Sequence, residues 1–216
     1  MRQNFDNQLK DLNQQLISMG SLCEEAIALS TKALQGLADH PEKRVAVLER
    51  EIDQMEREIE DSCMNLLLRQ QPVAQDLRTI SAALRMITDL ERIGDQASDV
   101  AELVPHIAGS QLGSKVAIGR MAEAVVLMVT NSVDAFVQKD LDMARKVQAD
   151  DDEVDALFTQ VKQELMNLIE KKDIDAEAAL DMLMAAKYFE RIGDHATNVA
   201  EWVEYSITGQ HKSLEE

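Results

Sequence analysis

The sequence predicts an all-α protein made of two tandem three-helix bundles, and three observations support this prediction. Only 3% of the 216 residues are aromatic, with three Pro and eight Gly, which is a helical composition. Apolar residues recur at alternating spacings of three and four, the period of an amphipathic helix. The pentapeptide Glu91-Arg92-Ile93-Gly94-Asp95 recurs letter for letter at residues 190–194, as expected for two copies of one structural unit.

In the first half, apolar stripes predict helices over about residues 5–37, 45–66 and 77–104. Breaks are expected near Pro41 and Pro72, because Pro cannot continue a helix interior. Pro105 and the segment 106–114, which contains Gly109 and Gly113, are expected to form a linker. Residues 1–106 are therefore predicted to be the first bundle.

The second half repeats this plan, with helices expected over about residues 118–135, 147–168 and 179–203. A turn at residues 171–175 takes the place of the one at Pro72. Short turns between neighbouring helices predict antiparallel packing. Residues 107–216 are predicted to be the second bundle.

Charge and hydropathy exclude some classes of partner. The formal net charge of −18 repels phosphate backbones, so no nucleic-acid partner is expected. The longest apolar run, residues 124–129, is too short to span a bilayer, so membrane association would go through partners. Cys23 and Cys63 lie on apolar stripes and are expected to be buried thiols. With no signal-peptide core at the N-terminus, the predicted location is cytoplasmic.

Carboxylates flank the apolar stripes at one level of each half. At about 100° per residue, Glu91 and Asp95 share one flank of their helix, and Glu190 and Asp194 repeat the arrangement. The preceding helices carry pairs four residues apart, Glu49 with Asp53 and Asp151 with Asp155. Hairpins centred near residues 71 and 173 would place each of these pairs opposite the next helix's pair.

Four like charges at one level repel each other unless cations or solvent compensate them. One hypothesis is a metal site in each bundle, since all-oxygen ligand sets suit Mg²⁺, Ca²⁺, Mn²⁺ or iron. The alternative is a solvated acidic face neutralised by Arg92 and Arg191. Asp99 extends the first set by one carboxylate. Its counterpart in the second half is Asn198, so the second set carries one negative charge fewer. His195 is expected to be exposed and not a ligand.

The two motif glycines, Gly94 and Gly193, are expected to permit close helix packing, with metal access as the other interpretation. Catalysis is not expected. A ferritin-like di-metal oxidase needs Glu-x-x-His, and no histidine here has Glu three residues before it. The sequence also lacks a phosphate-binding loop and a dinucleotide fingerprint. A metal-free helical scaffold and a carboxylate-metal enzyme of unrecognised type stay open as alternatives to a regulatory module.

The tandem bundles, the paired acidic motifs and the doubled Glu-Arg-Ile-Gly-Asp resemble the PhoU family of bacterial phosphate-uptake regulators, from Phe5 to about Ile207. The resemblance implies metal ions in each bundle, with iron, manganese, magnesium or zinc as candidates. By position, the implied ligands are Glu49, Asp53, Glu91, Asp95 and Asp99 in the first bundle and Asp151, Asp155, Glu190 and Asp194 in the second.

The same resemblance implies a function. Proteins of this family are non-catalytic, cytoplasmic and usually homodimeric negative regulators of phosphate uptake and phosphate-starvation signalling. They link the ATPase of the phosphate ABC transporter to a phosphate-sensing histidine kinase. The sequence has no Gly-rich cradle or Arg/Lys cluster for free phosphate, so direct phosphate sensing is not expected.

Overall fold

The computed structural model describes residues 2–37, 41–70, 72, 74–107 and 110–210. Within those ranges every regular element is an α-helix, which confirms the predicted fold class. The helices are α1 (Arg2–Leu34), α2 (Glu42–Gln70), α3 (Gln75–Ile107), α4 (Leu112–Lys115), α5 (Ile118–Gln138), α6 (Leu141–Glu170) and α7 (Ala176–Thr208).

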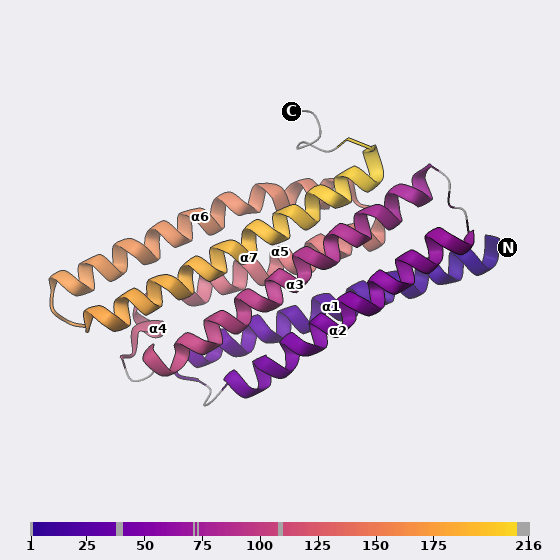
Figure 1. Cartoon of the computed structure of the whole chain (residues 1–216). Coiled ribbons are helices and arrows are strands. Elements are labelled where there is room, and N and C mark those ends of the chain that lie inside the picture. The colour runs from indigo at the N-terminus through magenta and orange to yellow at the C-terminus, as the bar shows by residue number, and fades with distance from the viewer. Residues whose placement is uncertain (1, 38–40, 71, 73, 108–109, 211–216) are drawn as a thin grey trace.

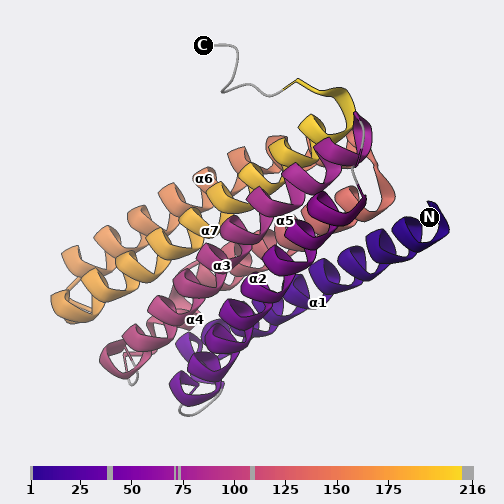
Figure 2. The same cartoon turned by 45° about the vertical axis from the view of Figure 1, so that its right-hand side comes forward.

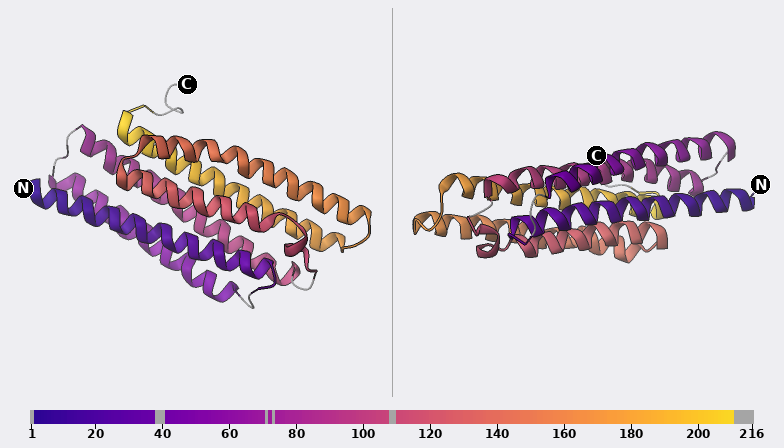
Figure 3. Two further views of the ribbon diagram at one scale, coloured as in Figure 1. Left: turned by 180° about the vertical axis from the view of Figure 1, so that it is seen from behind. Right: turned by 90° about the horizontal axis from the view of Figure 1, so that it is seen from below.

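The long helices run side by side and form an elongated body of two layers (Figures 1 and 2). One layer has the order α2, α3, α7, α6, and α1 and α5 cover its back (Figure 3). α1 packs against α2 and α3, while α5 packs against α6 and α7. The α2–α3 and α6–α7 turns lie at opposite ends of the body (Figure 1). Each half of the chain is thus a three-helix unit, and the two units share one layer.

The predicted apolar stripes form the core. On α1, Leu12, Leu16, Met19 and Cys23 are at most 1% exposed. The thiol of Cys23 donates to the carbonyl oxygen of Leu90 on α3 at 3.3 Å, and burial raises the pKa of this thiol. Cys63 is also buried and free, and burial raises its pKa to about 12. Both cysteines are therefore inert core residues, as predicted.

The most extensive helix contact in the described chain joins the two halves, through α3 and α7. Asp89 on α3 lies at this seam, with its Oδ1 2.9 Å from Nδ1 of His195. The side-chain amide of Asn198 donates to the same oxygen at 3.1 Å. His195 was expected to be exposed, and this is wrong: its side chain is only 19% exposed, because α7 turns it towards α3.

Two boundaries differ from the prediction. α3 continues through Pro105 to Ile107, because Pro105 lies in the last turn, where only one backbone hydrogen bond is lost. The predicted linker is also not wholly irregular, since residues 112–115 form α4. Residues 38–40, next to the predicted break at Pro41, and linker residues 108 and 109 lie outside the described residues.

Within the part of the chain that the structure describes, no helix combines the length and the apolar character needed to cross a bilayer.

Candidate metal centre

The two glycines of the repeated pentapeptide lie where paired helices approach closely. A Cβ built on Gly94 of α3 would come within 2.8 Å of Ile52 Cδ1 on α2. A Cβ on Gly193 of α7 would lie 3.3 Å from both Val154 Cγ1 and Asp151 Oδ1 on α6. This agrees with the prediction of close packing. The same closeness brings the carboxylates that flank the glycines towards the neighbouring helix.

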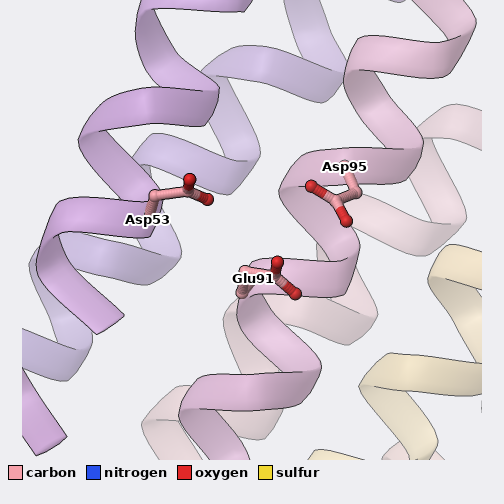
Figure 4. A group of neighbouring side chains, drawn as sticks. All are labelled: Asp53, Glu91 and Asp95. Carbon is pink, nitrogen blue, oxygen red and sulfur yellow. The ribbon is translucent and has the colours of Figure 1, made fainter. Parts of the chain in front are cut away.

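Three of the predicted ligands come together between α2 and α3. Asp53 projects from α2 towards Glu91 and Asp95 on α3 (Figure 4). One oxygen from each carboxylate lies within 4.8 Å of the other two. Side chains on facing helices can meet in this way only if the hairpin register is correct. The spacing of the acids in the sequence therefore did predict which helix faces carry this group.

Arginine takes part in the first group, as the alternative interpretation required. Arg92 Nη1 lies 3.1 Å from Asp95 Oδ2, and Arg92 Nε lies 3.4 Å from Glu91 Oε2. The Arg92 side chain is 54% exposed, so solvent screens its charge. One cation beside three carboxylates leaves the group with negative charge.

Glu49 and Asp99 belong to the margin of this group. The Ser98 hydroxyl donates to Glu49 Oε2 at 3.0 Å, so Glu49 lies level with Ser98 rather than with residue 94. This contact lies about one turn beyond the level predicted for Glu49. Asp99 is half-buried, and burial, followed by the charges of Glu102 and Asp95, raises its pKa.

Burial and like charge both act on the central acids. Burial raises the pKa of Glu91, and the neighbouring charge of Asp95 raises it further. The Oε2 atom of Glu91 is buried and accepts no hydrogen bond. A buried carboxylate oxygen without a hydrogen-bond donor is costly, and a cation would compensate it.

Glu56 on α2 is an acidic neighbour of this group that was not among the predicted ligands. It accepts a hydrogen bond from the Thr88 hydroxyl on α3 at 3.4 Å. Burial raises its pKa, as do the charges of Glu60 and Asp53, and Glu56 in turn raises the pKa of Glu91. The signal was present, because Glu56 follows Asp53 by three residues and so lies on the same helix flank.

The second bundle brings Asp151 on α6 close to the acids of α7. Burial raises the pKa of Asp151 to about 6, with further contributions from the charges of Asp194, Asp155 and Glu190. Burial, then the charge of Glu190, raises the pKa of Asp194, while Lys187 lowers it. No three of these acids, among the described residues, offer oxygens as close together as in the first bundle. The charges of Asp194, Asp155 and Glu190 nevertheless all act on Asp151.

The residues fit a hard or borderline cation. The first group supplies carboxylate oxygens only, which suits Mg²⁺, Mn²⁺, Ca²⁺ or iron. The Oε2 atom of Glu91 accepts no hydrogen bond, and the Arg92 guanidinium 3.4 Å away is exposed and screened by solvent, so a bound cation would add to its neutralisation. In the second bundle, Gly193 has no Cβ, which would otherwise lie 3.3 Å from Asp151 Oδ1.

Replacing Asp151 by Asn should stabilise the metal-free protein at pH 7, by roughly 1 kcal/mol after allowance for solvent screening. The raised pKa of Asp151, about 6 against an ordinary 3.8, means that the folded state binds more protons than the unfolded state between these values. The wild-type protein therefore gains stability from this group as the pH falls from 7 towards 4, and Asp151→Asn removes that gain. Thermal melting at pH 5 and pH 7 measures both effects.

The exposed neighbour Asp152 provides the control, because Asp152→Asn makes the same charge change outside the cluster. If Asp151→Asn melts below the wild-type protein at pH 7 without metal, this would contradict the destabilisation inferred for the buried Asp151 charge.

The fold and the site together define a class: helical proteins with an internal duplication, in which each half brings acidic side chains together between paired helices. The PhoU domain model matches residues 16–104 and 118–203, so both halves are copies of this domain. The chain belongs to the PhoU family.

Relatives support the assignment over nearly the whole length. The chain is 36% identical to the phosphate-specific transport system accessory protein PhoU homolog of Clostridium acetobutylicum, over 99% of this chain and 98% of the relative. It is 34% identical to the homolog of Pseudomonas aeruginosa, over 96% of this chain and 86% of the relative. The crystal structure of PhoU from Pseudomonas aeruginosa superposes with a TM-score of 0.83 at 32% identity, covering 95% of this chain and all of that one.

The crystal structure of the phosphate transport system regulatory protein PhoU from Streptococcus pneumoniae also matches, with a TM-score of 0.86. It covers 95% of this chain and 98% of that one, at 24% identity, and it supports the fold. The two superpositions show that the six long helices are arranged as in the family.

Proposed function

We propose that this protein is a non-catalytic, cytoplasmic negative regulator of phosphate uptake and phosphate-starvation signalling. The full-length similarity to phosphate-specific transport accessory proteins carries the proposal. The ATPase of the phosphate ABC transporter and a phosphate-sensing histidine kinase are its partners, and the protein acts as a homodimer. Contact with the membrane is made through these partners.

Metal ions bound by carboxylates are part of the proposal. Asp53 of α2 with Glu91 and Asp95 of α3 would hold the first site, with Glu49 and Asp99 at its margin. Asp151, Asp155, Glu190 and Asp194 would hold the second. The ion supplies positive charge between two helices that otherwise present like charges to each other. The carboxylates from the two helices of a hairpin then fix its register.

Deleting the gene from its own host tests the function. In medium rich in phosphate, the deletion strain should express alkaline phosphatase and other phosphate-starvation products that the wild-type strain represses. A plasmid copy of the wild-type gene should restore repression. Unchanged repression in the deletion strain would contradict the proposed role.

The partners are tested separately, by affinity purification of the tagged protein from cells grown with and without phosphate. Co-purification of the transporter ATPase and of the kinase, above the level of an untagged strain, is the expected result. Purification without either protein under both conditions would contradict the proposed link between them.

A further inference from the structure

The two ends of the elongated body are related by the internal repeat, but they differ in chemistry. At one end α2 turns into α3 and α7 ends, and at the other α6 turns into α7 and α3 ends (Figure 1). The first end carries two arginines and the only tryptophan of the chain, where the second end carries an acid and two apolar residues. The equivalent positions are Arg78, Arg85 and Trp202 at the first end and Glu177, Met184 and Leu103 at the second.

The two arginines lie along one face of α3, because seven residues separate them. The guanidinium of Arg85 lies over the ring of Trp202 on α7, 5.7 Å from its centre. Tyr205 packs edge-on against the same ring, with the ring centroids 5.7 Å apart. Arg78 lies against the end of α7, since a Cβ built on Gly209 would be 3.0 Å from Arg78 Nη1. Side chains of α3 and α7 together therefore form a cationic and aromatic surface at this end.

The charges of these two arginines are not neutralised by the described part of the chain. Other basic side chains have acidic partners, such as Arg145, whose guanidinium lies 2.9 Å from Glu204 Oε1. Among the described residues, neither Arg78 nor Arg85 forms an ion pair. The Nε atom of Arg78 is also buried without a hydrogen-bond acceptor. In a chain with 40 acidic and 22 basic residues, two such arginines leave a local site for an anionic group.

Exposed apolar side chains adjoin the arginines on the side of α2. Leu68 of α2 is 75% exposed, Met64 of the same helix is 45% exposed, and Leu77, which directly precedes the first arginine on α3, is 47% exposed. The hydrogen bond between Glu56 and Thr88 fixes the register of this hairpin. Leu68 and Leu77 lie about equally far from that bond towards the turn, so they are at one level of the hairpin. Single exposed leucines are ordinary, whereas a cluster of apolar side chains indicates an interaction site.

This surface has the composition of a protein interface. Trp, Tyr and Arg are the side chains that most often dominate the binding energy at interfaces, and apolar neighbours exclude water from them. The charge of the surface selects the partner. A carboxylate beside Arg85 is attracted, while the same carboxylate is repelled over most of a chain whose net charge is −18. An amphipathic helix with carboxylates along the edge of its apolar face matches both features.

A second copy of the chain and a lipid bilayer fit this surface less well. A two-fold contact through this end would bring the arginines of both copies together, and like charges repel. A contact between the two different ends of successive copies would not close, so it would form open chains. An anionic bilayer is wide enough to meet the acidic group of α2 and α3 as well, whereas a single helix contacts only the end.

We propose that the surface formed by Arg78, Arg85 and Trp202 with Leu68 and Leu77 is a docking site for an amphipathic helix of a partner protein. The carboxylates of that helix lie against the two guanidinium groups, and its apolar face covers the leucines and the exposed part of the indole ring. This inference rests on the proposed function in one respect only, which is that the protein acts through partner proteins. Because the opposite end lacks both arginines, the partner helix binds at one end of the body only.

Trp202 gives a direct test, because the chain has no other tryptophan and the emission therefore reports on this end alone. The probe is a synthetic helix with leucines at the helix period, glutamates on both flanks and no tryptophan. We expect it to bind the full-length protein saturably and to shift the Trp202 emission to shorter wavelength, because water leaves the ring. A peptide in which lysines replace the glutamates should leave the emission unchanged. If the glutamate peptide also leaves it unchanged, the proposal is overturned.

Variants locate the binding surface, with a fluorescein-labelled glutamate peptide followed by anisotropy. Arg85→Glu should weaken binding about tenfold, and Leu68→Gln with Leu77→Gln should weaken it by a similar factor. If Arg85→Glu lowers the melting temperature, Arg85→Gln replaces it and should show a smaller loss of binding. Arg120→Glu and Leu127→Gln are the matched controls, since both residues are exposed on α5 in the other layer, and they should bind like the wild-type protein. Equal binding by the docking-site variants and the controls would overturn the proposal.

Two further outcomes would assign the surface to another occupant and so overturn the proposal. The first is a shift of Trp202 emission with vesicles of phosphatidylcholine and phosphatidylglycerol but not with the peptide. The second is an emission that changes with protein concentration, together with open chains in sedimentation, which would indicate a second copy of the chain.

Affinity purification from cells separates the inference from the function on which it rests. Arg85→Glu should lose the transporter ATPase or the histidine kinase, and the Arg120→Glu control should retain both. If Arg85→Glu retains both as well, the docking site is overturned while the proposed function stands. If the wild-type protein co-purifies neither, the proposed function itself falls.

Discussion

Millimolar Mn²⁺ should raise the melting temperature of the metal-free protein by about 5 to 10 °C. An ion that binds only the folded state stabilises it by about 2.7 kcal/mol when its concentration is a hundred times the dissociation constant. For a chain of this size, each kcal/mol corresponds to about 2 to 4 °C. The measurement is a thermal melt after EDTA treatment and desalting, with and without the metal.

The first site should account for much of this rise in melting temperature. Neutral side chains at this site should stabilise the metal-free protein but weaken its stabilisation by Mn²⁺. Glu91→Gln with Asp95→Asn removes the Glu91 charge, which burial and the charge of Asp95 make costly, together with that neighbouring charge. We therefore expect this variant to melt above the wild-type protein without metal and to lose part of the response to Mn²⁺. A loss of stability unrelated to charge would instead lower the melting temperature both with and without metal.

Two exposed acids outside the clusters provide the matched control. Asp61→Asn with Glu153→Gln makes the same change in net charge at residues that the structure places in solvent. This variant should keep the full response to Mn²⁺. Sodium chloride of equal ionic strength controls for screening, and a shift no larger with Mn²⁺ than with sodium chloride would favour the solvated acidic face.

The helical architecture could be predicted because burial follows the helix period so closely. The positions on the α1 stripe, such as Leu12, Leu16 and Met19, are fully or almost fully buried. The duplication then gives the second bundle the same architecture. The division of the chain into domains 1–106 and 107–216 stays a prediction. The most extensive helix contact, between α3 and α7, joins the two halves and marks no boundary between them.

The seam between the halves could not be predicted from periodicity. Helical spacing gives the angle of a side chain around its own helix, but not which other helix packs there. His195 lies on the flank opposite the acidic one, and only the packing of α3 against α7 places Asp89 beside it. A side chain at this angle would be exposed in an isolated three-helix bundle, but the other half of the chain covers it here.

The first group of carboxylates could be predicted in part. The spacing of Asp53, Glu91 and Asp95 was sufficient, because each lies on a flank that the hairpin turns inward. The position of Glu49 depended on the centre of the turn, and an error of a few residues there moves it by a whole turn to Ser98. Glu56 was not predicted because it follows Asp53 by three residues, whereas the predicted ligands form pairs spaced by four.

Phe189→Ala should lower the free energy of unfolding by about 3 to 5 kcal/mol, the usual cost of removing a buried aromatic side chain. Phe189 is 0% exposed and is among the largest fully buried side chains of the described chain. It lies on α7, which packs against α3, α5 and α6, so few of its neighbours can move into the cavity without breaking other contacts. Urea denaturation followed by circular dichroism gives the free energy.

The chain itself supplies the control for this substitution. The equivalent position of the first half is Leu90, which is also 0% exposed, so leucine is compatible with this place in the repeat. Phe189→Leu should cost only about 1 kcal/mol, because it keeps most of the apolar volume. A cost below 1 kcal/mol for Phe189→Ala would mean that the second bundle is packed loosely at this level.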